Sequence, residues 1–177
     1  SAPVFRALFT ALDRWVTAGI APPPSCHPRI DDGTAADRAE VLLKFADRGF
    51  TAAIDPAKLP RLHRMDFGPD ATLGVATQPI REFEAYTAWV ADVDAELNEI
   101  GGIRLPDVAC PLGFHTGWNP RSTAIGAADE LATFAGFSVF FSREAILARY
   151  HDEAGYMHEA SQCIDDLIAN GFVLPQD

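Results

Sequence analysis

The chain has 177 residues, 48% of them hydrophobic, which is typical of a single domain with a substantial core. Its formal net charge of −11 argues against nucleic acid, which needs a basic face, and against an anionic membrane surface as partners. No apolar run approaches the roughly 18 residues of a transmembrane helix, and no signal-peptide pattern is present, so no compartment is indicated. Because the sequence begins with Ser1 and not with a methionine, we expect a processed, tagged or excised product whose native N-terminal context is missing.

The N-terminal segment predicts a strongly amphipathic helix over residues 4–18. Pro3 suits a first helical turn, and Gly19 suits the C-terminal end. Apolar residues recur at steps of three and four and form one broad stripe: Val4, Phe5, Leu8, Phe9, Leu12, Trp15 and Val16. Such a stripe needs a large partner surface, which either the rest of this chain or an absent partner supplies.

A proline-rich stretch divides the chain into three parts. Residues 1–20 form the helix, residues 21–34 form a stiff linker that ends in a turn, and residues 35–177 form the remaining α+β region. Thr34 is the expected N-cap of a helix over 35–47. Residues 51–79 have no convincing period, and only 73–76 suggest a short strand.

The central stretch predicts a long-looped β-hairpin over about residues 86–110. Residues 86–93 are rich in aromatic and β-branched types, and residues 94–99 are polar and turn-forming. The second strand, 103–109, contains Pro106, which places it at a sheet edge or a bulge. We therefore expect an α+β fold, with a small irregular, mostly antiparallel sheet around this hairpin and helices at both ends.

The last part of the chain predicts core and helices. Ser142 and Asp152 are expected to cap two helices, and the apolar tail 172–175 is expected to dock after Gly171. The phenylalanines between residues 129 and 141 are expected to fill core space: Phe134, Phe137, Phe140 and Phe141.

Four segments carry a resemblance that covers most of the chain. They are ALDRWVTAGIAPPPS (11–25), MDFGP (65–69), VDAELNEIGGIRLPDVACPLGFHTGWN (93–119) and GFVLPQD (171–177). In their order and content they resemble the C-terminal part of the bacterial alpha/beta hydrolase domain-containing proteins. NEIGGIRLP and TGWN are the more specific pieces, whereas residues 34–54 match poorly.

The resemblance implies a serine-dependent hydrolase of carboxylic esters, whose nucleophile sits on a Gly-x-Ser-x-Gly elbow. No such motif occurs in these 177 residues, and the family's histidine precedes the segment that matches the first helix. The chain would then supply the last helix of the hydrolase core, and an extension that shapes or covers the site. By this resemblance its partner is the remainder of a hydrolase chain; a self-partner through the 4–18 helix is the other possibility.

The loop after the hairpin holds the best candidates for substrate contact: His115, Trp118, Asn119 and Arg121. Arg121 could bind a substrate carboxylate or form a surface ion pair. His115 could line a site, or it could be a partly exposed loop histidine, which is the more common case. Because family members more often have tyrosine before Thr116, His115 is not expected to be a shared catalytic residue, and no catalytic residue is assigned to this chain.

Other groups of polar residues predict no cofactor and no metal. The acidic turn that contains Asp94 lacks the ligand spacing and the glycine of an EF-hand. His63 and Asp66 could form a dyad, but a loop hydrogen bond explains them equally well. The cysteines have no metal-ligand spacing and are expected to be buried thiols: Cys26, Cys110 and Cys163.

Three functions remain open from the sequence. The first is the non-nucleophile C-terminal segment of a hydrolase, inactive alone. The second is an independent binding or assembly module that docks its aromatic helix on a partner. The third is a standalone enzyme that uses His115, Arg121 and acidic residues of the hairpin.

Overall fold

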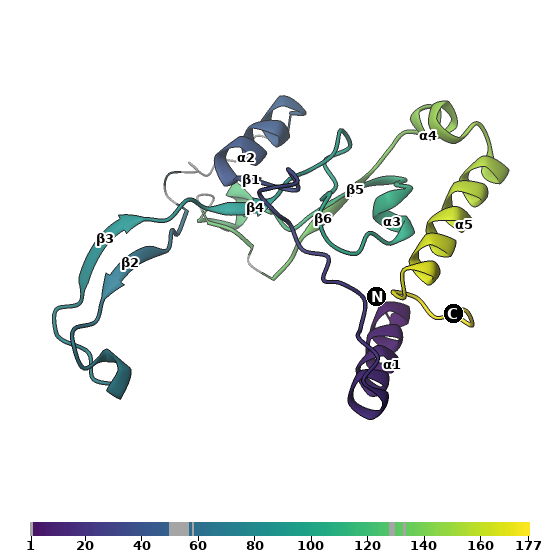
Figure 1. Ribbon diagram of the computed structural model, residues 1–177. Helices are drawn as coiled ribbons and strands as arrows, with labels where there is room; N and C mark the ends of the chain where they lie inside the picture. The colour runs from purple at the N-terminus through teal and green to yellow at the C-terminus, as the bar shows by residue number, and fades with distance from the viewer. Residues whose placement is uncertain (1, 50–56, 58, 128–129, 133) are drawn as a thin grey trace. The chain divides into compact units, whose positions relative to one another are not determined.

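The computed structural model describes residues 2–49, 57, 59–127, 130–132 and 134–177. Its elements divide into two compact units. The first unit contains residues 1–35, 91–119 and 132–177, and the second contains residues 36–90 and 120–131. The predicted α+β class, with small antiparallel sheets and helices at both ends, is confirmed (Figure 1).

The first unit is built mainly from helices: α1 (Ala2–Ala18), α3 (Pro106–Ala109), α4 (Arg143–Tyr150) and α5 (Glu153–Ala169). Both predicted caps are confirmed. The Ser142 hydroxyl accepts a hydrogen bond from the Ala145 backbone N–H at the start of α4, and the Asp152 carboxylate does the same for Gly155 at the start of α5.

A two-stranded antiparallel sheet, β5 (Gly113–Thr116) and β6 (Phe137–Phe140), lies in the same unit (Figure 1). His115 pairs with Ser138 in its register. Glycine is required at position 136, just before β6, because a Cβ atom there would lie only 2.4 Å from the carbonyl oxygen of Thr116. The two chain segments therefore approach more closely there than any side chain permits.

The C-terminal tail packs into the hydrophobic cluster of the first unit. Leu167 at the end of α5 and the tail residues Phe172 and Val173 are buried. Partly buried hydrophobic side chains surround them: Ile103, Leu105, Cys163 and Ile168. The predicted docking of the tail is thus confirmed.

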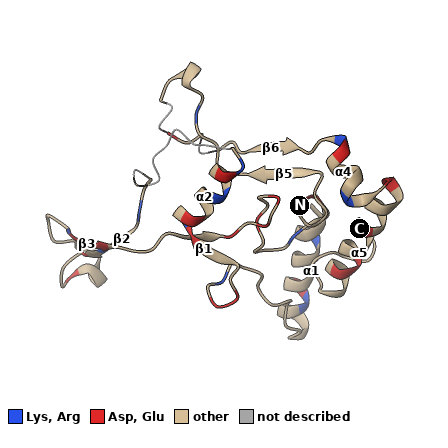
Figure 2. Cartoon of the chain, turned by 90° about the horizontal axis from the view of Figure 1, so that it is seen from above, with Lys and Arg blue, Asp and Glu red and all other residues tan. Residues whose placement is uncertain are grey.

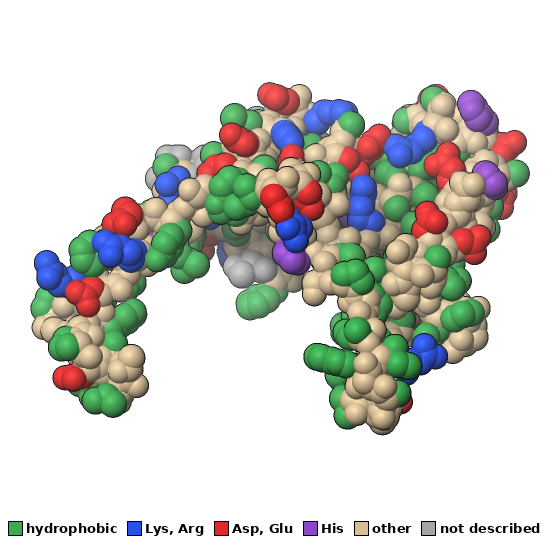
Figure 3. Space-filling view, in the orientation of Figure 1, with side chains coloured by type: hydrophobic (Ala, Val, Ile, Leu, Met, Phe, Trp, Pro, Cys, Tyr) green, Lys and Arg blue, Asp and Glu red, His purple; other side chains and the backbone are tan. Residues whose placement is uncertain are grey.

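Helix α1 packs against the rest of the first unit through Ala7 and Arg6 and leaves its aromatic stripe exposed. Ala7 is buried, and Arg6 forms an ion pair with Asp177 at 2.7 Å. The expected stripe is exposed at Phe5 (62%), Phe9 (70%), Leu12 (49%), Trp15 (54%) and Val16 (77%). Hydrophobic side chains accordingly lie at the surface over α1 in Figure 3.

The second unit contains α2 (Arg38–Asp47) and the antiparallel pair β2 (His63–Asp66) and β3 (Arg81–Ala85). A short 3-10 helix (Ala71–Leu73) follows β2. The third sheet pairs β1 (Ala35–Asp37) with β4 (Trp89–Ala91), and the division between the units passes through both strands.

Two predicted boundaries in the second unit are wrong. The helix expected over 35–47 begins only at Arg38, because the Asp37 side chain accepts from the Ala39 backbone N–H and caps it there, while the preceding residues form β1. Residues 73–76 form no strand, since Gly74 takes a left-handed conformation after the 3-10 helix. Residues 50–56 and 58 of the expected irregular region lie outside the described residues.

The pairing expected within the 86–110 hairpin is also wrong. The chain does reverse after β4, and Val93 forms an antiparallel bridge with Glu99. Yet β4 pairs with β1, and the expected second strand is partly the helix α3. Pro106 occupies the first turn of α3, where its missing N–H costs nothing.

The expectation that all the late phenylalanines fill the core is wrong as well. Phe134 and Phe140 are exposed, and only Phe137 and Phe141 are partly buried. Phe137 packs edge-on against Phe114, with ring centroids 5.7 Å apart. Residues 128, 129 and 133 of this segment lie outside the described part.

No helix in the described ranges has both the length and the apolar character needed to cross a bilayer.

Candidate functional site

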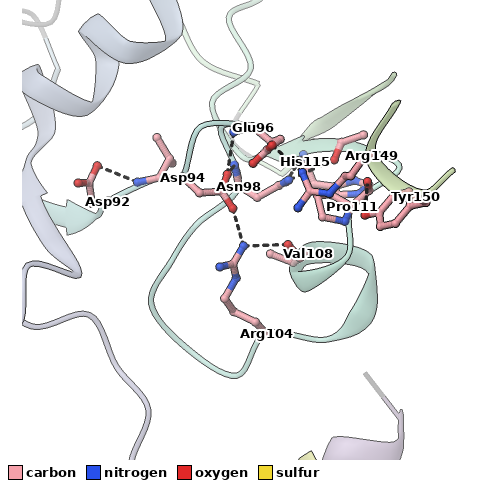
Figure 4. Close-up of polar contacts among 12 residues, drawn as sticks. Asp92, Asp94, Glu96, Asn98, Arg104, Val108, Pro111, His115, Arg149 and Tyr150 are labelled. Atoms are coloured by element: carbon pink, nitrogen blue, oxygen red, sulfur yellow. Dashed lines mark hydrogen bonds and ion pairs between the residues drawn. The ribbon is translucent and has the colours of Figure 1, made fainter. Parts of the chain in front are cut away.

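The turn formed by residues 94–99, called the acidic turn here, organises a group of hydrogen-bonded polar side chains in the first unit. This polar centre consists of Asp94, Asn98 and Arg104. One carboxylate oxygen of Asp94, Oδ1, accepts backbone N–H groups of Glu96 and Asn98, each at 3.0 Å (Figure 4). Leu97 takes a left-handed conformation (φ 65°), which closes the turn so that the Asp94 N–H reaches the carbonyl of Asn98. Aspartate commonly forms such side-chain turns because it bonds backbone groups two residues further on.

The turn places the buried side chain of Asn98 against strand β5. Asn98 is 1% exposed. Its Nδ2 donates to the carbonyl of Gly113 at 3.1 Å, and its Oδ1 accepts from the backbone N–H of His115 at 2.9 Å (Figure 4). The side chain therefore bonds this edge of β5 as a peptide group of a neighbouring strand would, and it fixes the backbone at His115.

A partly buried ion pair supports the other side of the turn. Arg104 donates from Nη2 to Oδ2 of Asp94 at 2.5 Å and to the carbonyl of Val108 at 2.8 Å. The two charged side chains are 28% and 21% exposed. The Nε of Arg104 is buried with no hydrogen-bond partner in the described part of the chain. Arg104 thus ties α3 to the acidic turn.

Two further contacts attach α4 to this centre. Tyr150 is 2% exposed, and its hydroxyl donates to the carbonyl of Pro111 at 3.0 Å. Burial raises the pKa of this phenol. Arg149 also pairs with Glu96 at 2.6 Å.

Figure 2 shows acidic residues on α4 and α5, consistent with the acidic composition.

The outer side of the β5–β6 sheet carries a Ser–His pair. Nδ1 of His115 lies 2.7 Å from Oγ of Ser138, its cross-strand partner. A shallow groove of about 360 Å³ runs over the pair, lined by His115, Thr116, Gly117, Gly136, Phe137 and Ser138. Both polar groups are open to a ligand, because Ser138 is exposed and His115 is half-buried.

This pair lacks the other parts of a serine-hydrolase site. A serine nucleophile works with a histidine that an acid orients and with hydrogen-bond donors for the oxyanion. No carboxylate contacts the imidazole within the described residues. Ser138 also lies within strand β6 of a two-stranded sheet instead of on a strand-to-helix elbow. The geometry fits polar contact with a ligand better than nucleophilic attack.

Of the four predicted substrate-contact residues, His115, Trp118 and Asn119 belong to the first unit and Arg121 belongs to the second. Asn119 donates from Nδ2 to the carbonyl of Ala135 at 2.6 Å, so its side chain holds the loop. Half-buried Trp118 donates its backbone N–H to the Thr116 hydroxyl at 3.0 Å. Arg121 belongs to the second unit and bonds its own turn, with Nε 3.4 Å from the carbonyl of Gly126. Their role in substrate binding stays a prediction, and only His115 lines the groove.

Sequence reasoning missed two residues of the site. Ser138 lies in a phenylalanine-rich segment whose composition predicts core, and nothing in that composition indicates a role for its hydroxyl. Asn98 was interpreted as a turn residue, which it is, but its side chain bonds a strand 15 residues away. The signal that could have found it is its place in the segment NEIGGIRLP, beside a predicted strand.

The remaining polar candidates have other partners. His63 contacts the carbonyl of Phe83 and the carboxylate of Glu82 through Nδ1, at 3.0 and 2.9 Å, while Asp66 accepts from the backbone N–H of Gly68. The His63–Asp66 dyad is therefore wrong. Across the described residues, no cluster of three His, Cys, Asp or Glu side chains is placed to hold a metal ion.

Comparison with known proteins identifies the family. The sequence model of the alpha/beta hydrolase domain family matches residues 1–177, and the chain belongs to this family. The predicted recognition is thereby confirmed, and a hydrolase-like fold follows from it. No significant match was found among curated proteins or among solved structures.

Proposed function

We propose that this chain is the C-terminal, non-nucleophile segment of a serine-dependent hydrolase. In that protein it shapes or covers the site where a longer polypeptide hydrolyses a carboxylic ester. One observation carries the proposal. The whole chain belongs to an alpha/beta hydrolase family, yet its 177 residues contain no Gly-x-Ser-x-Gly elbow.

The exposed stripe of α1 supports this role. A helix with one broad aromatic face is stable when that face is covered, and Phe5, Phe9, Trp15 and Val16 are each more than half exposed. In the proposed protein the hydrolase core of the same polypeptide covers the stripe. The opposite contacts, Ala7 and the Arg6–Asp177 ion pair, connect α1 to the tail.

The polar centre supports a shaping role more than a chemical one. Asn98, Asp94 and Arg104 bond one another and the backbone, so they define the position of β5 instead of offering free reactive groups. The β5–β6 sheet then presents His115 and Ser138 in the lining of a shallow groove. Such a surface can contribute polar contacts to an ester substrate held mainly by the core.

A second function is favoured by the same exposed stripe. In this case the chain is an independent binding or assembly module, and α1 docks on a different protein. The two functions differ in what covers Trp15: the same polypeptide in the first, another one in the second.

The intact mass of the protein isolated from its source, with its N-terminal sequence, tests the proposal. We expect a species much heavier than the 19.2 kDa of this chain, with a Gly-x-Ser-x-Gly elbow in the additional sequence. A native mass of 19.2 kDa would contradict the hydrolase-segment function and favour the binding module.

A further inference from the structure

Two cysteines far apart in the sequence meet at one groove of the first unit. Cys110 ends α3, and Cys163 lies in the middle of α5, which packs against α3. The two thiols are close enough to influence each other's ionisation. Both line a groove of about 830 Å³ that is open to solvent. Cys26 lines it as well and is exposed, so the expectation that it is a buried thiol is wrong. A small molecule can therefore reach the pair.

The surroundings distinguish the two sulfurs. Cys110 is 5% exposed, whereas Cys163 is half-buried and has its Sγ 3.8 Å from the carbonyl of Arg104. The charged groups that face the pair come from α4, α5 and the loop before α3: Arg149, Glu159, Asp166 and Arg104. Burial raises the pKa of both thiols, which makes their reaction slow at neutral pH.

Accessibility sets an order of reaction. Cys110 is buried, whereas Cys163 is half-buried and is the more accessible of the two residues. Cys163 is therefore the first sulfur to react, and Cys110 is positioned to react second.

We propose that Cys110 and Cys163 are a reversible thiol–disulfide pair, oxidised by a low-molecular-weight disulfide that enters the groove. The Cys163 thiolate attacks one sulfur of the small disulfide, forms a mixed disulfide, and releases one small thiolate. The Cys110 thiolate then attacks the Cys163 sulfur and releases the second small thiolate. The two cysteines are oxidised and the small disulfide is reduced to two thiols, which take up the two cysteine protons.

The bond would change the unit in a defined way. It would tie the end of α3 to the middle of α5, across the groove and beside the hydrophobic cluster of Leu167 and Phe172. A cross-link over the long segment 110–163 restricts the unfolded chain and stabilises the folded one. This inference concerns a modification site, and it does not depend on the proposed hydrolase function.

The test is oxidation of the full 177-residue chain with oxidised glutathione, followed by intact mass and peptide mapping without reduction. We expect the folded chain to lose two hydrogen atoms in a bond that joins the peptides containing Cys110 and Cys163. Dithiothreitol should restore the original mass, and the oxidised chain should melt at a higher temperature. Cys26→Ser is the matched control and should form the same bond.

Variants of the pair separate the two steps. Cys110→Ser should stop at a mixed disulfide, with one glutathione on Cys163, and Cys163→Ser should form no internal bond. Persistence of both thiols in the oxidised wild-type chain would overturn the proposal, as would a bond from either cysteine to Cys26. Because the decisive result comes from the wild-type chain, a variant that fails to fold leaves the test intact.

Discussion

The carboxamide of Asn98 holds the backbone of His115, since Oδ1 accepts the His115 N–H at 2.9 Å while Nδ2 donates to Gly113 on the same strand. The bond to Gly113 is buried and the bond from His115 is partly buried, and the turn that supplies them is fixed by Asp94. The position of the Ser–His pair on the β5–β6 sheet therefore depends on a side chain from a different loop.

Asn98→Ala should destabilise the chain by roughly 2–4 kcal/mol, because it leaves the carbonyl of Gly113 and the N–H of His115 buried without partners. Urea denaturation measures this loss. Asn98→Asp is the near-isosteric comparison, since it replaces the Nδ2 donor with a carboxylate oxygen that faces the carbonyl of Gly113. Its deficit should shrink as pH falls from 7 towards about 5, where the protonated carboxyl can donate to Gly113. An unchanged urea midpoint for Asn98→Ala would show that these bonds do not hold the strand.

Tyr150→Phe should cost roughly 1–2 kcal/mol, because it removes the buried hydrogen bond to the carbonyl of Pro111. Tyr156→Phe is the matched control. Its ring packs edge-on against Tyr150 at 5.3 Å, and no hydrogen bond of its hydroxyl appears in the described part of the chain. Thermal denaturation of the two variants should separate clearly, and equal losses would contradict a specific role for the Tyr150 hydroxyl.

Stability should fall at alkaline pH under reducing conditions. Burial raises the folded-state pKa of the Cys110 and Cys163 thiols and of the Tyr150 phenol above their ordinary values. The unfolded chain therefore loses these protons first, so this stability is fully present below about pH 8 and is lost as pH rises further. Urea midpoints between pH 7 and 10 measure the loss. Cys110→Ala/Cys163→Ala should flatten the decline between pH 8 and 9, and an equally steep decline would contradict the assignment.

Trp15→Glu should have little effect on the 177-residue chain and a large effect on the longer hydrolase that we propose. Trp15 is 54% exposed, so the stability of the 177-residue chain should change by less than about 0.5 kcal/mol. In the longer polypeptide the new carboxylate would face an apolar surface, and recovery of folded, ester-hydrolysing protein should drop several-fold. Thr17→Glu adds the same charge outside the stripe and should affect neither protein. Equal behaviour of the two variants in the longer polypeptide would contradict docking through the stripe.

The sequence was sufficient where a local rule decides structure. The period of α1, the Ser142 and Asp152 caps, and the left-handed Gly19 and Gly171 all follow from neighbouring residues. The predicted strand pairing is wrong, because the apolar residues in 86–93 indicate a strand but do not indicate which strand pairs with it. Pro106 was interpreted within a strand pattern although it equally suits the first turn of a helix, which is where it lies.

The site was less predictable than the helices, for a physical reason. The contact between His115 and Ser138 depends on strand register, and the contact between Asn98 and β5 depends on a turn bringing a side chain to a distant edge. Neither has a local sequence period. The exposure of Phe134 and Phe140 shows the same limit, since hydrophobicity alone does not say which side of a short sheet is covered.

The most direct test of the central claim is to find which serine reacts with a fluorophosphonate probe, which labels activated serine nucleophiles. The native protein and the 177-residue chain would be labelled in parallel, and the modified peptide would be identified by mass spectrometry. Our account predicts a labelled serine in the native protein outside these 177 residues, and no labelling of the chain alone. Labelling of Ser138 in the isolated chain, abolished by His115→Ala without loss of folding, would contradict it and make this chain an enzyme in its own right.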